Sequence, residues 1–578
     1  MEAYSMTEST NRVPGKTSFF KPWFASGEPW IWMNAAAVGI SVTAVVGILL
    51  LLAVKGLAHF WPADIALIEY ESDTGKAGRV YGELIELDTL PVQQFLESGG
   101  PAAWVSKDSN VMQRWLVKTG NRKVAAPDFR WIYEAQITSI EYPENVVAIE
   151  RLEWGNAYGV PLQIDVPKGS DGNSSLQVVS GDEVSQAIVQ RLEETSFIRG
   201  QIDDLEGGVL NRINNDLERL RLERRGVELK GIQDLRLSEI DEEERQLREE
   251  YAISSTQLRG LYAKLNQGFL LIETADQSQI KIKVSDVLHT WQPNPMGSLQ
   301  KSALYLSNLW RFLSENPREA NTEGGVFPAI FGTVLMVLLM SVIVTPFGVI
   351  AAVYLREYAK QGPLVRIIRV AVNNLAGVPS IVYGVFGLGF FVYFLGGNID
   401  QLFYPEALPA PTFGTPGLIW ASLTLALLTV PVVIVSTEEG LTRIPRSLRE
   451  GSMALGATQA ETLFRVILPM ASPAILTGVI LAVARAAGEV APLMLVGVVK
   501  LAPTLPLDAN FPYLHLDRKF MHLGFHIYDV GFQSPNVEAA RPLVYATALL
   551  LVTLIVGLNL TAITLRGRLE RVYRGVES

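Results

Sequence analysis

The chain has 578 residues, no cysteine and a formal net charge of −10 at pH 7, and 49% of its residues are hydrophobic. The absence of cysteine excludes disulfides, zinc–thiolate sites and thiol nucleophiles. The mean hydropathy of +0.22 is high for a soluble protein and indicates membrane spans. Residues 56–325 hold 28 basic and 42 acidic residues, whereas the remainder holds 21 and 17. The acidity therefore belongs to one segment, and nothing in the charge pattern favours binding to nucleic acid.

Six apolar runs are long enough to cross a bilayer. The first, Ile31–Val54, lacks a small-residue cleavage site, so we expect a retained membrane helix at about 31–55 and not a removed signal peptide. The other five predicted spans are Phe327–Tyr354, Leu375–Leu395, Leu418–Val435, Ala474–Val498 and Leu543–Leu565.

The basic residues between these runs predict the orientation of the chain. Arginines follow the second, fourth and sixth runs, whereas residues 396–417 contain no Lys or Arg. Because positively charged loops stay in the cytoplasm, we expect residues 1–30 and 567–578 there. The acidic segment 56–325 then lies outside, and the permease core covers 326–566.

The pattern of the acidic segment predicts a water-soluble α+β insertion. Strand-like runs fall in 56–180 and 266–295, and Phe269–Glu273 and Gln279–Val284 flank a short polar stretch typical of a hairpin. In 183–265, apolar residues recur at intervals of four and three, which predicts an antiparallel helical hairpin of coiled-coil type, with its reversal between Gly226 and Gly231. It is either a docking or sensing module or a solvated spacer.

Residues 436–497 combine a polar segment with an apolar run. Gly456 breaks the polar segment, and we expect Pro469 to close it. Thr437-Glu438-Glu439 precede this helical hairpin, and we expect them to cap and orient it.

Four residues of the polar segment stand at the spacing of the E-A-A…G…I-x-L-P signature of importer-type ABC permeases: Glu450, Gly456, Leu468 and Pro469. Small or apolar residues replace the other signature positions: Gly451, Ser452 and Val466. In that family this segment, here 438–470, is the coupling loop that docks into a cytoplasmic ATPase.

Three flanking segments resemble the phosphate permeases of the PstA type: Asn373–Ser380, Thr437–Glu439 and Ala484–Leu493. The resemblance covers residues 326–578 and the first span. It implies an all-α permease of six transmembrane helices, similar to type I ABC importers, in the bacterial inner membrane. The implied partners are a homologous second permease subunit, two copies of an ATPase subunit, a periplasmic phosphate-binding protein and inorganic phosphate. The resemblance gives no role to the insertion.

The sequence contains no phosphate-binding loop, because Gly15-Lys16-Thr17 lacks the glycine expected at position 10 and no strand precedes it. We therefore expect no enzymatic activity and no bound cofactor in this chain. ATP would be used by the partner ATPase.

Arg485 and Glu489 are the sharpest candidates for the substrate path. We expect them to lie one helical turn apart inside the fifth span, where charges are costly and face a cavity or a partner. A guanidinium can hold two oxygens of an oxyanion, so Arg485 would line the phosphate path, with Glu489 as its counter-ion. The alternative is a structural ion pair.

Asn373, Asn374 and Ser380 flank a Gly-x-Pro sequence at the start of the third span. Such a break suits a cavity-lining segment, so we expect these three residues to line the substrate path, although it equally suits a simple interfacial helix start. His522 and His526 lie four residues apart, but without a third well-placed ligand we predict no metal site and expect an amphipathic helix there.

Three other functions remain open from the sequence. The permease could carry another oxyanion, such as sulfate or molybdate. The chain could be an envelope signalling or scaffold protein that acts through its coiled coil. It could also be a self-contained channel or an ion-driven carrier, which would not need the coupling loop.

Overall fold

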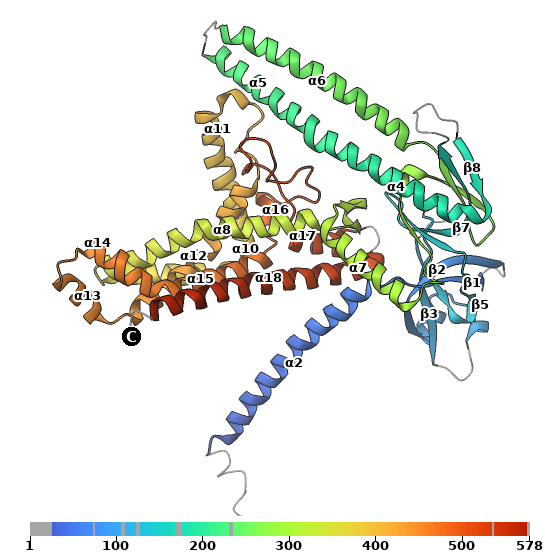
Figure 1. Cartoon of the computed structure of the whole chain (residues 1–578). Coiled ribbons are helices and arrows are strands. Elements are labelled where there is room, and N and C mark those ends of the chain that lie inside the picture. The colour runs from blue at the N-terminus through green and yellow to red at the C-terminus, as the bar shows by residue number, and fades with distance from the viewer. Residues whose placement is uncertain are drawn as a thin grey trace, which may run out of the picture.

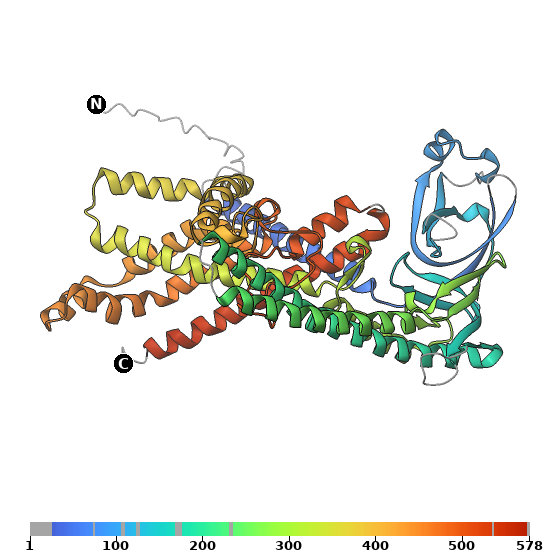
Figure 2. The ribbon, with the colours of Figure 1, turned by 90° about the horizontal axis from the view of Figure 1, so that it is seen from above.

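The computed structural model describes residues 26–72, 76–105, 110–122, 128–167, 176–230, 235–534 and 537–574. A bundle of long helices carries a β-rich domain at one end, and a helical hairpin runs from this domain back along the bundle (Figures 1 and 2). Six helices in the described ranges are long and apolar enough to cross a membrane, as the sequence predicts.

The spans are built from α-helices, some of them continued by π-helical segments. In chain order these are α2 Glu28–Ala58, α8 Phe327–Val353 with η7 Tyr354–Tyr358, α10 Ser380–Phe386 with η8 Gly387–Gly396 and α11 Gly397–Phe403, α12 Leu418–Arg443, α14 Gln459–Thr462 with η10 Leu463–Ile467 and α15 Leu468–Gly488, and α18 Val537–Arg574. The separate helices α9 Pro363–Leu375, α13 Arg446–Ala454, α16 Leu493–Val496 and α17 Leu523–Tyr528 connect them.

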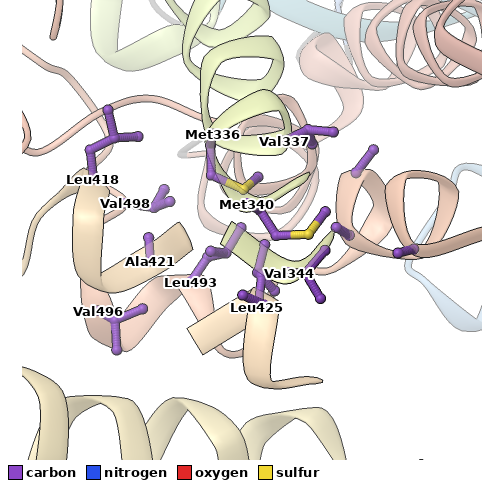
Figure 3. Packing of buried hydrophobic residues seen from close by; sticks show 14 of the residues in the cluster. Met336, Val337, Met340, Val344, Leu418, Ala421, Leu425, Leu493, Val496 and Val498 are labelled. Atoms are coloured by element: carbon purple, nitrogen blue, oxygen red, sulfur yellow. The ribbon is translucent and has the colours of Figure 1, made fainter. Parts of the chain in front are cut away.

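The core of the bundle lies around α12, which packs against both α8 and α15. Met336, Val344 and Leu425 are among its fully buried side chains (Figure 3). Small residues let the helices approach closely: a Cβ on Gly440 would lie 2.4 Å from the Cβ of Ala474. Such contacts are typical of helix pairs in membranes, where close packing replaces the hydrophobic effect.

The first span stands apart from this core. α2 meets α18 at its C-terminal end, where a Cβ on Gly56 would lie 3.0 Å from the backbone of Ala546. The rest of α2 diverges from the bundle (Figure 1), and its apolar side chains are exposed. They are therefore available to lipid or to another subunit.

The β-rich domain contains two antiparallel sheets. The first has the strand order β4-β3-β2-β1-β5, and the second has the order β10-β9-β7-β6-β11, with β8 paired to β7. The first sheet consists of β1 Ile65–Glu71, β2 Ala77–Pro91, β3 Val111–Lys118, β4 Phe129–Tyr133 and β5 Ile137–Glu141. The second consists of β6 Val147–Arg151, β7 Ala157–Pro167, β8 Leu176–Ser180, β9 Phe269–Glu273, β10 Gln279–Lys283 and β11 Val287–Trp291. The hairpin expected at 269–284 is present, with Glu273 opposite Gln279.

A long helical hairpin interrupts the second sheet. It comprises α4 Val184–Asp203, η4 Asp204–Leu210, α5 Asn211–Leu229 and α6 Leu235–Leu265. Ion pairs cross between its arms, among them Arg224–Glu244 at 2.9 Å and Arg236–Glu223 at 2.8 Å. Gly226 lies inside α5, so the expected start of the reversal there is wrong, and Gly231 lies outside the described residues.

Two sets of contacts position the insertion, one with the bundle and one between its own parts. α5 touches the turn Pro405–Ala407, which follows the third span. On the return path, α7 Ser298–Ser314 and the segment after it contribute Arg311 and Arg318, which both bind Glu150 of β6. The hairpin therefore contacts the bundle, and ion pairs join the returning segment to the second sheet.

Asn294 joins the beginning and the end of the insertion. Its side chain accepts from the backbone N–H of Ile65 at 2.8 Å and donates to the carbonyls of Ile65 and Pro143 at 2.8 and 2.7 Å. We expect Asn294→Ala to lower the opening free energy of β1 by about 1–3 kcal/mol, because backbone groups lose their partners. Hydrogen exchange of the full chain measures this at Ile65, whereas the exposed control Asn266→Ala should leave it unchanged.

Candidate functional site

The fifth span ends in a break of the helix. α15 stops at Gly488, Glu489 is extended with φ −81° and ψ 129°, and the chain turns again only in α16. The predicted span Ala474–Val498 is therefore wrong at its end, and the span instead begins upstream, covering Gln459–Gly488. Pro492 lacks a backbone N–H, so a straight helix through this point would lose a hydrogen bond.

Neighbouring helices hold the break in place through glycines. A Cβ on Gly384 of α10 would lie 2.7 Å from Pro492, and one on Gly524 of α17 would lie 2.7 Å from Val490. After the break, the carbonyl of Val496 accepts from the backbone N–H of Gly417 at 2.9 Å. Backbone outside a helix is tolerated in a membrane only where protein surrounds it or it lines a cavity, and this packing meets that condition.

Arg485 and Glu489 form an ion pair across the end of the helix. Arg485 Nε lies 3.6 Å from Glu489 Oε1, and the side chains are 33% and 21% exposed. Among the described residues, neither side chain makes a hydrogen bond. The expected proximity is present, but the expected placement on one helix face is wrong, since Glu489 lies outside the helix. A loose, accessible pair leaves the guanidinium free to bind a further anion.

The three polar residues predicted near the third span belong to two different helices. Asn373 and Asn374 are exposed in α9, whereas Ser380 begins α10 after Pro379. The predicted span start at Leu375 is therefore wrong, because Leu375 ends α9 and the span begins at Ser380. Asn373 lines a cavity of about 610 Å³ at the end of α12, and the residues around this cavity do not include Arg485.

The coupling-loop segment forms two helices around a tight turn. α13 ends at Ala454, Gly456 has φ +94°, which favours glycine, and α14 begins at Gln459. Thr458 and Glu461 form a capping box, with the Glu461 N–H donating to Thr458 Oγ1 at 3.2 Å. The expectation that Pro469 closes this segment is wrong, since it lies in the first turn of α15, after Leu468, and the helix continues through it.

Arg449 anchors α13 to the bundle. Its guanidinium donates to Glu357 Oε1 at 2.8 Å, to the Leu441 carbonyl at 3.0 Å and to the Ile444 carbonyl at 3.1 Å. Glu357 lies in η7, directly after α8, so one side chain joins three segments. Glu357 was not predicted from the sequence, because nothing in its local pattern marks so distant a partner.

Thr437, Glu438 and Glu439 do not cap the loop. They lie inside α12, which continues to Arg443, so the expectation of a cap is wrong. Glu438 instead binds Arg369 of α9 at 2.5 Å.

The far end of the coupling loop exposes apolar side chains beside Glu450. Leu455 is 92% exposed, Met453 47% and Leu448 40%, and no residue of α13 is buried. Exposed apolar groups clustered in this way mark a protein interface. Leu455 was not predicted from the sequence, although its position beside Gly456 in a turn was a usable signal.

The two histidines after the break have a structural role. His522 Nδ1 accepts from the Gly524 N–H at 3.1 Å and caps α17, and burial lowers its pKa to about 4. His526 is also buried, and its pKa is lowered to about 4 by the same cause. The expected amphipathic helix is wrong, because α17 is short and its first two residues and His526 are buried. No group of metal ligands occurs among the described residues.

Comparison with known proteins agrees with this arrangement. Residues 344–574 match the family model of the binding-protein-dependent transport system inner membrane component. The chain is 37% identical over 239 residues to the phosphate transport system permease protein PstA of Mycobacterium leprae, covering 41% of this chain and 69% of the relative. It is 34% identical to the PstA protein of Yersinia pestis, covering 43% of this chain and 75% of the relative.

Some relatives are matched over a smaller part of their length. The chain spans 52% of PstA 1 of Mycobacterium tuberculosis, at 38% identity. A solved structure of the MetNI methionine ABC transporter is also similar, with 19% identity and a TM-score of 0.31, covering 47% of this chain and 99% of that one.

The protein is a multi-pass membrane permease of the ABC importer class. It belongs to the family of binding-protein-dependent permeases that includes the PstA proteins.

We expect Arg449→Gln to loosen α13, because the substitution removes a charged group with three acceptors. The cost of a lost charged hydrogen bond, ~1.5–3 kcal/mol, corresponds to roughly tenfold or more faster hydrogen exchange in α13. Arg446→Gln is the matched control, since Arg446 is exposed on the same helix. Equal exchange in both variants would contradict the anchoring role.

Proposed function

We propose that this chain is a permease subunit of an ATP-driven phosphate importer and forms half of its translocation pore. The observation that carries the proposal is the Arg485–Glu489 pair at a helix break, in a chain related to PstA permeases. An oxyanion needs a fixed cation in a low-dielectric path, and a guanidinium provides one with two parallel donors.

In this proposal Arg485 binds the phosphate and Glu489 keeps the guanidinium paired when the path is empty. The pair is loose at 3.6 Å, so an anion can replace the carboxylate at a small energetic cost. The break at Glu489 lets this region move separately from the rest of α15, which alternating access requires. Ser380, at the start of α10, would contribute to the same path, whereas Asn374 is exposed on α9 and would face a partner.

The coupling loop would transmit the work of ATP hydrolysis. Two copies of a cytoplasmic ATPase would serve this chain and a homologous second permease, and the loop around Glu450 would dock on one of them. The exposed Leu455 and Met453 supply the apolar part of that contact. The Arg449–Glu357 pair would then carry the displacement of α13 to the end of α8.

This function requires the inner membrane, with both termini in the cytoplasm and the insertion in the periplasm. The distribution of arginines supports this orientation. A periplasmic phosphate-binding protein would deliver the substrate and select it, since the acidic insertion is a poor collector of anions. The helical hairpin, which touches the turn Pro405–Ala407, would lie beside the face where that protein docks.

A permease for sulfate or molybdate is the main alternative within the class. The identity to relatives named as phosphate permeases favours phosphate. The scaffold and carrier alternatives have no observation in their favour.

We expect Arg485→Gln to lower ATP-dependent uptake of labelled phosphate in membranes that hold all subunits. Loss of a charged hydrogen bond predicts a decrease of roughly tenfold or more. Arg366→Gln is the control, because Arg366 is exposed on α9 and does not line the path. Normal uptake by an assembled Arg485→Gln complex would show that the ion pair has only a structural role and would contradict the proposed phosphate path. Uptake of sulfate in place of phosphate by the intact complex would contradict the assigned substrate.

We expect Glu450→Lys to reduce uptake by weakening the contact with the ATPase, while the chain still folds, since Glu450 is exposed. Co-purification of the ATPase with the permease measures this contact. Glu193→Lys is the control, because Glu193 is also exposed but lies on α4 of the insertion. A carrier that needs no ATPase would be indifferent to Glu450→Lys.

A further inference from the structure

A polar cavity lies at the end of α12, away from the helix break. Its volume is about 610 Å³, and its walls come from η7, α9 and the last turns of α12. The charged and amide-bearing residues around it are Arg356, Arg369, Asn373, Glu438, Glu439 and Arg443. Glu438, Glu439 and Arg443 lie in the last turns of α12, which leads directly into the coupling loop.

Two of its arginines have side chains without a partner of opposite charge among the described residues. Arg369 is neutralised by Glu438 at 2.5 Å. The side chains of Arg356 and Arg443 make no ion pair or hydrogen bond with any other described residue. Within the described part of the chain, the Glu439 carboxylate is likewise unpaired, and it is the group that opposes an anion here. The cavity thus offers two free guanidinium groups and the Asn373 amide, against one carboxylate.

The position of α9 adds a second, independent observation. One face of this helix contributes to the cavity through Arg369, Val372 and Asn373, whereas Leu364 and Ile367 are 71% and 65% exposed. A helix with a polar face and an exposed apolar face is typical of the membrane surface. Basic pockets between membrane helices at such a depth bind phosphate-bearing headgroups.

We propose that this cavity binds a phosphate group, from either a lipid headgroup or inorganic phosphate, through Arg356, Arg443 and Asn373. The planar guanidinium matches the oxygens of a phosphate, and two of them exceed the opposing charge of Glu439. Where the ligand is inorganic phosphate, the inference rests on the proposed function, and the site would sense the transported product.

A bound phosphate group would act on the coupling loop. Arg356 precedes Glu357, the partner of Arg449, and Arg443 is the last residue of α12 before the loop. An anion that bridges Arg356 and Arg443 joins the ends of α8 and α12. Because α13 is anchored to these same two helices through Arg449, occupancy holds the coupling loop in one position.

The test uses the complete transporter in lipid nanodiscs, with hydrogen exchange at the end of α12 and in α13 as a local readout. One arm uses a neutral lipid without a phosphate group and adds inorganic phosphate. The other uses phosphatidylglycerol without added phosphate. Protection in the first arm identifies inorganic phosphate as the ligand, and protection in the second identifies the lipid headgroup.

Matched variants separate this site from the pore. The double variant Arg356→Gln/Arg443→Gln should raise the half-saturating ligand concentration at least about tenfold, since charged hydrogen bonds are lost. Glu439→Gln should lower it by about fivefold, because a nearby negative charge is removed. Arg366→Gln, on α9 but outside the cavity, should change nothing.

Absence of protection in both arms, or protection that survives in the double variant, would overturn the proposal. The outcome is independent of the uptake result for Arg485→Gln. If the transporter moves phosphate but shows no protection, only the proposal of this site is contradicted. If the complex shows protection but moves no phosphate, the proposed function is contradicted and the proposal of the site is supported.

Discussion

The helix break at Gly488–Pro492 is the constraint on which the rest of the permease depends. Breaking a helix at membrane depth leaves backbone groups that need partners or a cavity. Here the cost is reduced by close packing, because Gly384 and Gly524 admit Pro492 and Val490 at distances at which a Cβ would not fit without a shift of its neighbours. The break releases Glu489 from the helix and leaves Arg485 with a single, loose partner. A charged, accessible site inside a packed bundle follows from this one interruption.

Long-range contacts connect the break to both ends of the molecule. Val490 packs on Gly524 of α17, and Asp529, just after α17, accepts from Asn321 at 3.1 Å and pairs with Lys500 at 3.0 Å. Asn321 belongs to the segment that returns from the insertion, so the insertion touches the same group of helices as the break. At the opposite end, Arg449 ties the coupling loop to α8 and α12. The returning segment of the insertion therefore contacts the helices that surround the break.

Local sequence patterns predicted which helices and strands form, whereas contacts between residues far apart in the chain determine where these elements end. Apolar length predicted six spans, and alternation with a polar turn predicted the hairpin of Phe269–Glu273 and Gln279–Lys283, all of which the structure contains. The proximity of Arg485 and Glu489 followed from their spacing, but the helix end between them did not, because partners far along the chain hold it. Asn373 was assigned to the pore for the same reason: the sequence does not reveal that α9 is a separate helix beside α12.

The most direct test of the central claim uses the natural absence of cysteine. Gly488→Cys places a thiol beside the ion pair without a clash, since nothing lies within 4 Å of a Cβ built on Gly488. In the assembled transporter, with uptake retained, the rate of modification by an anionic thiol reagent is measured with and without phosphate. Val38→Cys on the exposed apolar face of α2 is the unreactive control. We predict that the thiol introduced by Gly488→Cys reacts and that phosphate, but not sulfate, slows the reaction. A thiol that does not react, or that reacts equally fast with phosphate, would contradict a phosphate path at Arg485 and Glu489.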